Sequence, residues 1–533
     1  MNGVVLAGHR FTLDERRRRA IFGVLPGIWT VMLHSAVLDL PRADVIDALD
    51  ADRYRIYWII GSFLLGGATG MATTGFWRAR FGLRTTYVGA LLLFATAATL
   101  CATVESAEAM APWRLVSGYA MGVVLCAGML ELWCECPGEE ELAMTLYAMG
   151  VYLSALLGVI FGGFLLYRIS WQALFLVELP LGIVAAALAR LLLPDDAPPQ
   201  DARRPPFDVA GLVFFAAWVA TMIPVVVLGH YWGWLDSPFF VPWAAAFAIS
   251  SVAFVGWGLL AAAPLIDLRP LGHRNFGLGL VVKALFSIDL FVLVALLSGY
   301  MIGARGYQWW QGGFVFLPAF ATMATTMLAG ARVGRDRDRK LRIFVGLAVM
   351  SAVTWHLGRV DLYTSKVWLA LWLGVWGAGA GLAIGPTMLT VFAGLPHDTL
   401  SHAAGVFNIF RSLPVFAVGT LLVVLATVQQ DTHFDRLRLR ITYDRPIVAA
   451  THTAVERHAA SRGGGAASAR QSSAFLGRWV HANANAFALG DVLRVLALVT
   501  ASSLLLVPLL RPPPGTAREE EPAGCATESP APT

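Results

Sequence analysis

Four ionisable side chains lie inside long apolar runs, where such groups are rare. Asp289 stands near the middle of KALFSIDLFVLVALL, Glu178 lies in FLVELPLG, and His34 and Asp39 lie in VMLHSAVLDL. A charge in hydrocarbon is costly, so these residues must face water or a partner, which marks functional sites. A buried carboxyl group favours its protonated form, and histidine changes charge near neutral pH. We therefore expect these four residues to be the candidates for proton coupling.

Each candidate also has a structural interpretation that the sequence leaves open. Asp289 could simply be the partner of a polar group, although Lys283 lies about 120° away around a helix and is poorly placed to pair with it. Glu178 could be an interfacial carboxylate that faces water. His34 could be a hydrogen-bonded packing residue.

Arg114 is a candidate for lining or gating a cavity. It lies a few residues inside an apolar run, where a guanidinium needs a carboxylate or backbone carbonyls. Glu178 is placed at a similar depth and is a candidate partner. The alternative is that Arg114 snorkels to the membrane interface.

The cysteine-containing stretch CECPGEEE (134–141) follows Glu131, but it lacks the second ligand group that a metal site needs. We expect it to be a solvated helix end and predict no metal site. The chain has no Gly-x-x-x-x-Gly-Lys-Ser/Thr loop and no nucleophile–base signature. We therefore predict neither an ATP-driven pump nor an enzyme, and no cofactor.

The elements that must position these residues are membrane helices. Of 533 residues, 57% are hydrophobic and 14% charged, against about 25% charged in soluble domains. Runs of about 20 apolar residues are long enough to cross a bilayer. We predict an all-α polytopic membrane protein with fourteen spans, near residues 20–40, 56–76, 85–104, 111–134, 143–166, 172–193, 208–229, 239–260, 276–301, 310–331, 342–357, 367–392, 403–428 and 488–510.

The basic side chains predict how the chain lies in the membrane. Alternate short loops carry arginine-rich stretches, at residues 16–19, 78–84, 203–204, 269–274 and 332–342, and these indicate the cytoplasmic side. The excess of basic residues is explained in this way and does not indicate a nucleic-acid partner. With an even number of spans, we expect both termini in the cytoplasm of a bacterial inner membrane. The first span would itself be the targeting signal.

Proline-rich and polar stretches suggest the domain organisation. The predicted parts are a cytoplasmic N-terminus (1–19), an N-terminal six-helix half (20–193), a linker with two extra helices (194–275), a C-terminal six-helix half (276–510) with a periplasmic loop (429–487), and a disordered tail (511–533). Similar arginine and glycine clusters follow the second and tenth spans, which suggests an internal repeat.

The stretch TGFWRARFGLRTT (74–86) separates the second and third spans. Its arginines hold two span ends in the cytoplasm, and its glycines permit a tight reversal. It resembles the loop signature of the major facilitator superfamily, Gly-x-Leu-x-Asp-Arg-x-Gly-Arg. The positions that fit are Gly75, Arg80, Gly82 and Arg84, whereas Ala79 stands where the acid is usual.

Further motifs resemble the fourteen-span drug:proton antiporter branch of that superfamily, the EmrB/QacA type. RLVSGYAMG supplies Arg114, Gly118 and Gly122, and GVIFGG supplies Gly158, Gly162 and Gly163. WQALFLVELPLG has Glu178 where the branch has Asn, and GVFNIFRSLP carries Asn408 and Arg411 three residues apart on one helix face. IDLRPLGHRNF (266–276) also fits. The glycine pairs have the small-xxx-small spacing that lets helices approach closely.

The resemblance implies two six-helix halves with two extra helices between them, and alternating access to a central cavity. It implies proton-coupled efflux of hydrophobic or amphipathic small molecules. It also implies that Asn408 and Arg411 line the cavity or join the halves, and that a periplasmic membrane-fusion adaptor is a partner. The usual first-span acid is absent, since His34 stands near its position.

Two alternatives stay open. The same fold supports export of an endogenous metabolite or siderophore. The missing acids at the first span and at Ala79 also fit a non-transporting sensor or assembly protein. For the loop itself, we expect Arg80 and Arg84 to contact either a helix C-terminus or the acidic residues 139–141.

Overall fold

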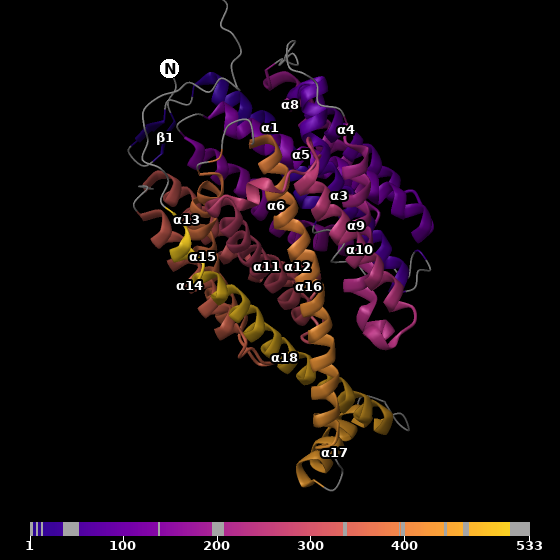
Figure 1. Ribbon diagram of the computed structural model, residues 1–533. Coiled ribbons are helices and arrows are strands. Elements are labelled where there is room, and N and C mark those ends of the chain that lie inside the picture. Colours follow the sequence, from indigo (N-terminus) through magenta and orange to yellow (C-terminus); the bar gives the residue numbers. More distant parts are fainter. Residues whose placement is uncertain are drawn as a thin grey trace, which may run out of the picture.

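The computed structural model describes residues 4–6, 9–11, 14–35, 49, 53–136, 139–194, 207–333, 338–393, 395, 400–441, 445–461 and 468–511. Asp39 lies outside the described residues. The chain is a bundle of long helices (Figure 1). One short antiparallel strand pair, β1 (Val4–Leu6) and β2 (His9–Phe11), precedes the first helix.

The N-terminal half is built from α1 (Glu15–Ser35), α3 (Arg53–Phe81), α4 (Leu83–Cys101), α5 (Ala107–Glu135), α6 (Glu140–Arg168), α7 (Ala173–Leu176) and α8 (Glu178–Leu192). Two further helices follow, α9 (Val209–Trp232) and α10 (Phe240–Leu260). The C-terminal half contains α11 (Arg274–Gly303), α12 (Trp309–Val315), α13 (Leu317–Val333), α14 (Arg339–Leu357), α15 (Lys366–Phe392), α16 (Leu400–Arg438), α17 (Pro446–Ser461) and α18 (Ser468–Leu504). Among the described residues, short 3₁₀ turns lie at Trp234–Asp236, Arg269–Gly272 and Val507–Leu509.

The polytopic all-helical class is confirmed. Among the described residues, eleven helices are long and apolar enough to cross a membrane, and α13 contributes a shorter apolar helix, Leu317–Ala331. Each of the fourteen expected spans overlaps a helix. Two of those helices are interrupted, because Pro180 and Pro318 have no N–H to donate to the carbonyl four residues earlier. Accordingly, α7 ends at Leu176 and α12 ends at Val315.

The two halves repeat one packing scheme. In the N-terminal half, α1 packs on α6 and α8, α3 on α5, and α4 on α5 and α8. In the C-terminal half, α11 packs on α16 and α18, α13 on α15, and α14 on α15 and α18. The matching order is the structural form of the suggested repeat. Helices α9 and α10 pair with each other outside the halves, where α9 contacts α3 and α16.

Glycine brings α3 and α5 into backbone contact. A Cβ at Gly118 or Gly122 would collide with the carbonyl oxygens of Phe63 and Gly67 on α3. In the C-terminal half, Gly377 meets the backbone of Ala319 in the same way. Gly158, Gly162 and Gly163 are buried along α6.

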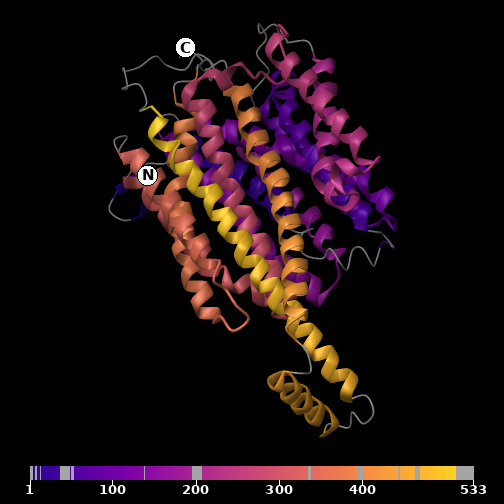
Figure 2. The same ribbon diagram turned by 60° about the horizontal axis from the view of Figure 1, so that its bottom comes forward.

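The segment expected as a periplasmic loop contains helix. Helix α16 continues to Arg438, α17 follows, and α18 begins at Ser468, so that the end of α16, the whole of α17 and the start of α18 form a stalk beyond the bundle (Figures 1 and 2). The sequence did not predict helix between residues 429 and 487, because charged and polar residues leave no long apolar run there. We call this the stalk end, and the opposite end, where α1 begins and α18 ends, the terminal end.

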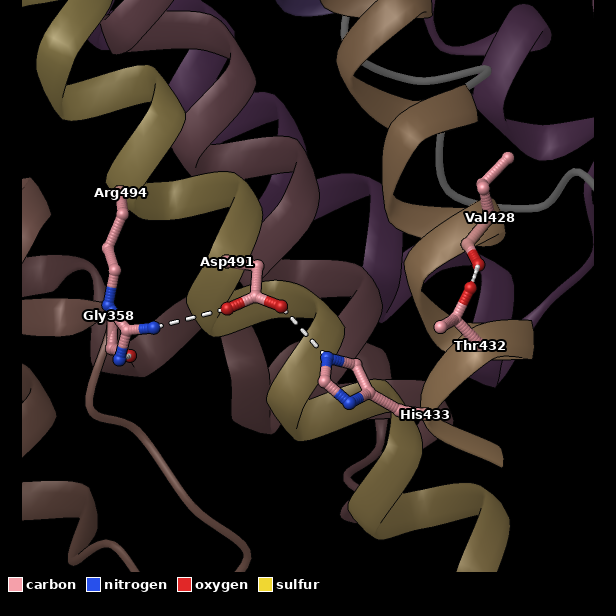
Figure 3. A network of polar contacts seen from close by, with 6 residues as sticks. All are labelled: Gly358, Val428, Thr432, His433, Asp491 and Arg494. Carbon is pink, nitrogen blue, oxygen red and sulfur yellow. Dashed lines mark hydrogen bonds and ion pairs between the residues drawn. The ribbon is translucent and has the colours of Figure 1, made fainter. Parts of the chain in front are cut away.

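A polar network ties the base of the stalk together (Figure 3). His433 of α16 contacts Asp491 of α18, with 2.8 Å between Nε2 and Oδ2. Arg494 donates to the other oxygen of Asp491 at 3.1 Å and to the carbonyl of Gly358 at 3.1 Å. The network therefore joins α16 and α18 to the end of α14.

Candidate transport site

Three polar residues from three helices meet inside the N-terminal half. Nη1 of Arg114 on α5 lies 2.5 Å from Nε2 of His34 on α1, and Nδ1 of His34 lies 3.7 Å from Oε1 of Glu178 on α8. All three side chains are buried. Because Arg114 can only donate, Nε2 must accept, which places the imidazole proton on Nδ1, facing Glu178. We call this chain of contacts the relay.

Aromatic rings surround the relay. The His34 ring lies 5.2–5.6 Å from the rings of Phe63, Phe94 and Phe175. The Arg114 guanidinium lies over the Phe63 ring, 4.2 Å from its centroid. This cation–π contact and the low polarity around the relay strengthen the electrostatic interactions within it.

Asp289 occupies the corresponding place in the C-terminal half. It is fully buried on α11, the repeat counterpart of α1. Its carboxylate accepts hydrogen bonds from Thr354 Oγ1 of α14 at 3.0 Å and from Thr500 Oγ1 of α18 at 2.9 Å. Neutral hydroxyls satisfy the carboxylate without supplying a counter-charge.

A third polar group lies where the halves meet. Tyr147 of α6 donates to Asn408 Oδ1 of α16 at 2.9 Å, and Arg411 Nε lies 3.4 Å from the same oxygen. Nearby, the Lys283 ammonium of α11 lies over the ring of Tyr152 of α6, 4.8 Å from its centroid. We name Tyr147, Tyr152, Lys283, Asn408 and Arg411 the seam cluster, since it joins the two halves.

The halves close against each other at the terminal end. The ring of Trp133 on α5 lies 5.5 Å from that of Phe392 on α15, which in turn lies 5.2 Å from Phe407 on α16. Next to these rings, Arg342 of α14 donates to Glu141 of α6 at 2.8 Å. These contacts join the two halves at the terminal end.

Comparison with known proteins identifies the family. A model described as "Major Facilitator Superfamily" matches residues 22–419. The chain belongs to the major facilitator superfamily. The predicted resemblance is thereby confirmed, and with it the transporter fold.

Several curated members of the superfamily are similar along most of the chain. The multidrug export protein EmrB of Haemophilus influenzae is 22% identical, over 91% of this chain and 94% of its own length. The probable multidrug resistance protein EmrY of Escherichia coli is 22% identical over 81% and 85%. The tetracenomycin C resistance and export protein of Streptomyces glaucescens is 24% identical over 75% of each chain.

The superfamily loop motif lies at the terminal end. Gly82 has a φ of 75°, a conformation that favours glycine and allows the reversal between α3 and α4. Arg84 lies 3.4 Å from the carbonyl of Leu193, the residue that caps the C-terminus of α8. Residue 79 lines a cavity of about 400 Å³, which His402 and Gly405 of α16 also line.

Two glutamates at the end of α5 and just after it contact arginines of α1. The carboxylate of Glu135 accepts bidentate hydrogen bonds from Arg16 at 2.6 and 2.8 Å, and the carboxylate of Glu139 lies 3.4 Å from the guanidinium of Arg17. The expected solvated helix end is wrong, because Glu131, Glu135 and Cys136 are all buried. The N-terminal arginines of α1 neutralise this region from a distance of more than 100 residues along the chain.

The structure therefore brings together candidate residues that the sequence could identify only one at a time. Arg114 and Glu178 were expected as partners, and the structure places His34 between them. Lys283 was considered only as a partner for Asp289, and its position in the seam cluster was missed. The signal for it was present, because the chain has only three lysines and Lys283 is the one in an apolar run.

Proposed function

We propose that the chain is a proton-coupled exporter of hydrophobic or amphipathic small molecules that works by alternating access. The relay carries this proposal, because it places the buried carboxyl group of Glu178 beside the imidazole of His34, whose other nitrogen contacts the permanent charge of Arg114. The similarity to a multidrug export protein and to a tetracenomycin C resistance and export protein supports the same function.

The relay can couple protonation to packing. With Glu178 ionised, its charge balances that of Arg114 through the neutral imidazole. When Glu178 takes up a proton, Arg114 loses this compensation inside a shell of phenylalanines. Leaving one charge of a buried pair uncompensated costs several kcal/mol. The N-terminal half then gains stability by moving Arg114 toward other acceptors, which repacks α1, α5 and α8.

Asp289 supplies a second protonation site in the C-terminal half. The hydroxyls of Thr354 and Thr500 can donate to the ionised carboxylate, and each can also turn to accept from the protonated carboxyl group. Both forms are then satisfied. We propose that Asn408 and Arg411 of the seam cluster are the gating residues that link these two sites across the interface.

We propose a bacterial inner-membrane location with both termini in the cytoplasm and the stalk in the periplasm. The stalk would then project toward an adaptor protein of the membrane-fusion type. We further propose the division of the chain into 20–193, 194–275 and 276–510, with transport involving no covalent step and no cofactor.

Dye efflux tests the function. A bacterium lacking its own exporters would express the chain and be loaded with neutral N-phenyl-1-naphthylamine, cationic ethidium or anionic fluorescein. We expect at least one dye to be expelled, and a protonophore to stop the expulsion. Glu178→Gln should abolish it, whereas Glu108→Gln, which changes an exposed acid paired with Arg55, should not. Efflux that survives the protonophore would overturn the coupling.

A further inference from the structure

Two cations of the seam cluster share one region of the interface. Lys283 and Arg411 are both buried, on neighbouring helices α11 and α16. Both lie against α6: the Lys283 ammonium lies over the ring of Tyr152, and Arg411 shares the Oδ1 oxygen of Asn408 with Tyr147. The seam cluster therefore concentrates positive charge where the halves meet.

No anion balances this charge among the residues that the structure describes. Neither Lys283 nor Arg411 makes an ion pair there, and the Lys283 ammonium has no hydrogen-bond acceptor in the same part of the chain. Asp289, on the same helix as Lys283, is turned away toward Thr354 and Thr500. What contacts the cations is aromatic or amide: the Tyr152 and Phe286 rings for Lys283, and Asn408 for Arg411.

Aromatic rings and neutral amides compensate a buried ammonium only in part. A ligand with a negative charge would complete the set of contacts. The surrounding rings of Tyr152, Phe286 and Phe291 match a flat apolar body.

We propose that the seam cluster binds the anionic group of the substrate, and that the chain exports amphipathic organic acids in their deprotonated form. Lys283 would hold the carboxylate and Arg411 would attract it, while the rings contact the apolar body. This inference rests on the proposed export function, and it narrows the substrate class.

Equilibrium binding tests the charge preference. The purified chain in lipid nanodiscs would be titrated with tritiated 1-naphthoate, and in parallel with 1-naphthamide and 1-naphthylmethylammonium, which share its ring system. We expect 1-naphthoate to bind at least about tenfold more tightly than either analogue. Lys283→Met should remove that preference, weakening 1-naphthoate about tenfold or more while changing 1-naphthamide little. Lys283→Arg should retain much of it.

Lys366→Met is the matched control. Lys366 also lies over a tyrosine ring, 4.3 Å from the centroid of Tyr307, but it is exposed. Equal affinity for 1-naphthoate and 1-naphthamide in the unmodified chain would overturn the proposal, even if every Lys283 variant failed to fold. Protonophore-sensitive dye efflux together with equal affinities would overturn only the substrate class. If no dye is expelled and 1-naphthoate binds no more tightly than its analogues, the export function is overturned as well.

Discussion

Asp289 and Lys283 lie six residues apart on α11, are both buried, and contact different parts of the molecule. Asp289 accepts hydrogen bonds from Thr354 and Thr500 inside the C-terminal half. Lys283 lies against Tyr152 of the N-terminal half. One helix therefore carries an acid that belongs to its own half and a base that belongs to the interface, so the two charges can be altered independently.

Replacing Asp289 with Asn removes the charge of the side chain and keeps its shape. The amide retains an oxygen that accepts from Thr354 or Thr500, so we expect the variant to fold and bind substrate. It cannot take up a proton, so we expect proton-driven efflux to fall at least about tenfold. Efflux rates in proteoliposomes with an imposed pH gradient measure this. Asp236→Asn, at an exposed acid, is the control, and unchanged efflux in Asp289→Asn would exclude the proposed role.

Removing Arg114 should destabilise the N-terminal half through Glu178. In Arg114→Ala the carboxylate loses its compensating charge, and breaking a buried pair costs about 3–5 kcal/mol. We expect Glu178→Gln in the same chain to restore part of that loss, because the orphaned charge is gone. The free energies of unfolding of the two single variants and the double variant, measured in micelles, give the coupling. Strictly additive losses would show that the relay does not act as a unit.

Restoring the missing acid of the loop motif should favour closure of the terminal end. Ala79 shares a cavity with the first turns of α16, whose N-terminus carries partial positive charge. A carboxylate there is worth about 0.3–1 kcal/mol, so Ala79→Asp should raise the closed, outward-open population about two- to fivefold. Slower hydrogen exchange in residues 400–410 would report it. Ala79→Asn has the same shape without the charge, and an equal effect of both would refute the electrostatic explanation.

Breaking the polar network of Figure 3 should loosen the base of the stalk. Asp491→Asn removes the charge that holds both His433 and Arg494. We expect faster hydrogen exchange at residues 429–438 and at the start of α18, with exchange in α1 and α5 unchanged. Asp431→Asn is the control, since Asp431 is an exposed acid on α16, the helix that carries His433. Unaltered exchange at the stalk would mean that apolar packing alone holds it.

Sequence alone predicted the helices well and their contacts poorly. Apolar runs locate spans because the bilayer sets their length, and even the short run at 342–357 corresponds to a complete helix, α14. Matching depth suggested that Arg114 and Glu178 are partners. That His34 lies between them depends on how α1 is rotated against α5 and α8, which no local pattern specifies. The same holds for Lys283, whose neighbour Tyr152 is 131 residues away.

Charged segments were misread for a related reason. From the sequence alone, Glu131 and Glu135 are expected near a solvated helix end. In the structure both are buried, and Arg16 of α1 donates two hydrogen bonds to the carboxylate of Glu135. The helical segments of the stalk between residues 429 and 487 have no long apolar run. They are held instead by contacts between distant segments, such as Ser472 donating to the carbonyl of His452 at 2.9 Å.

Helix α16 is long enough that a small tilt moves its outer end by several ångströms. Its 39 residues correspond to about 58 Å of continuous helix, roughly twice the thickness of the apolar layer it crosses. A tilt of about 10° around its midpoint displaces its outer tip by about 5 Å. Because α16 also carries Asn408 and Arg411, the same tilt moves these two residues by only about 2–3 Å, so a small rearrangement at the interface is about doubled at the outer end of the helix.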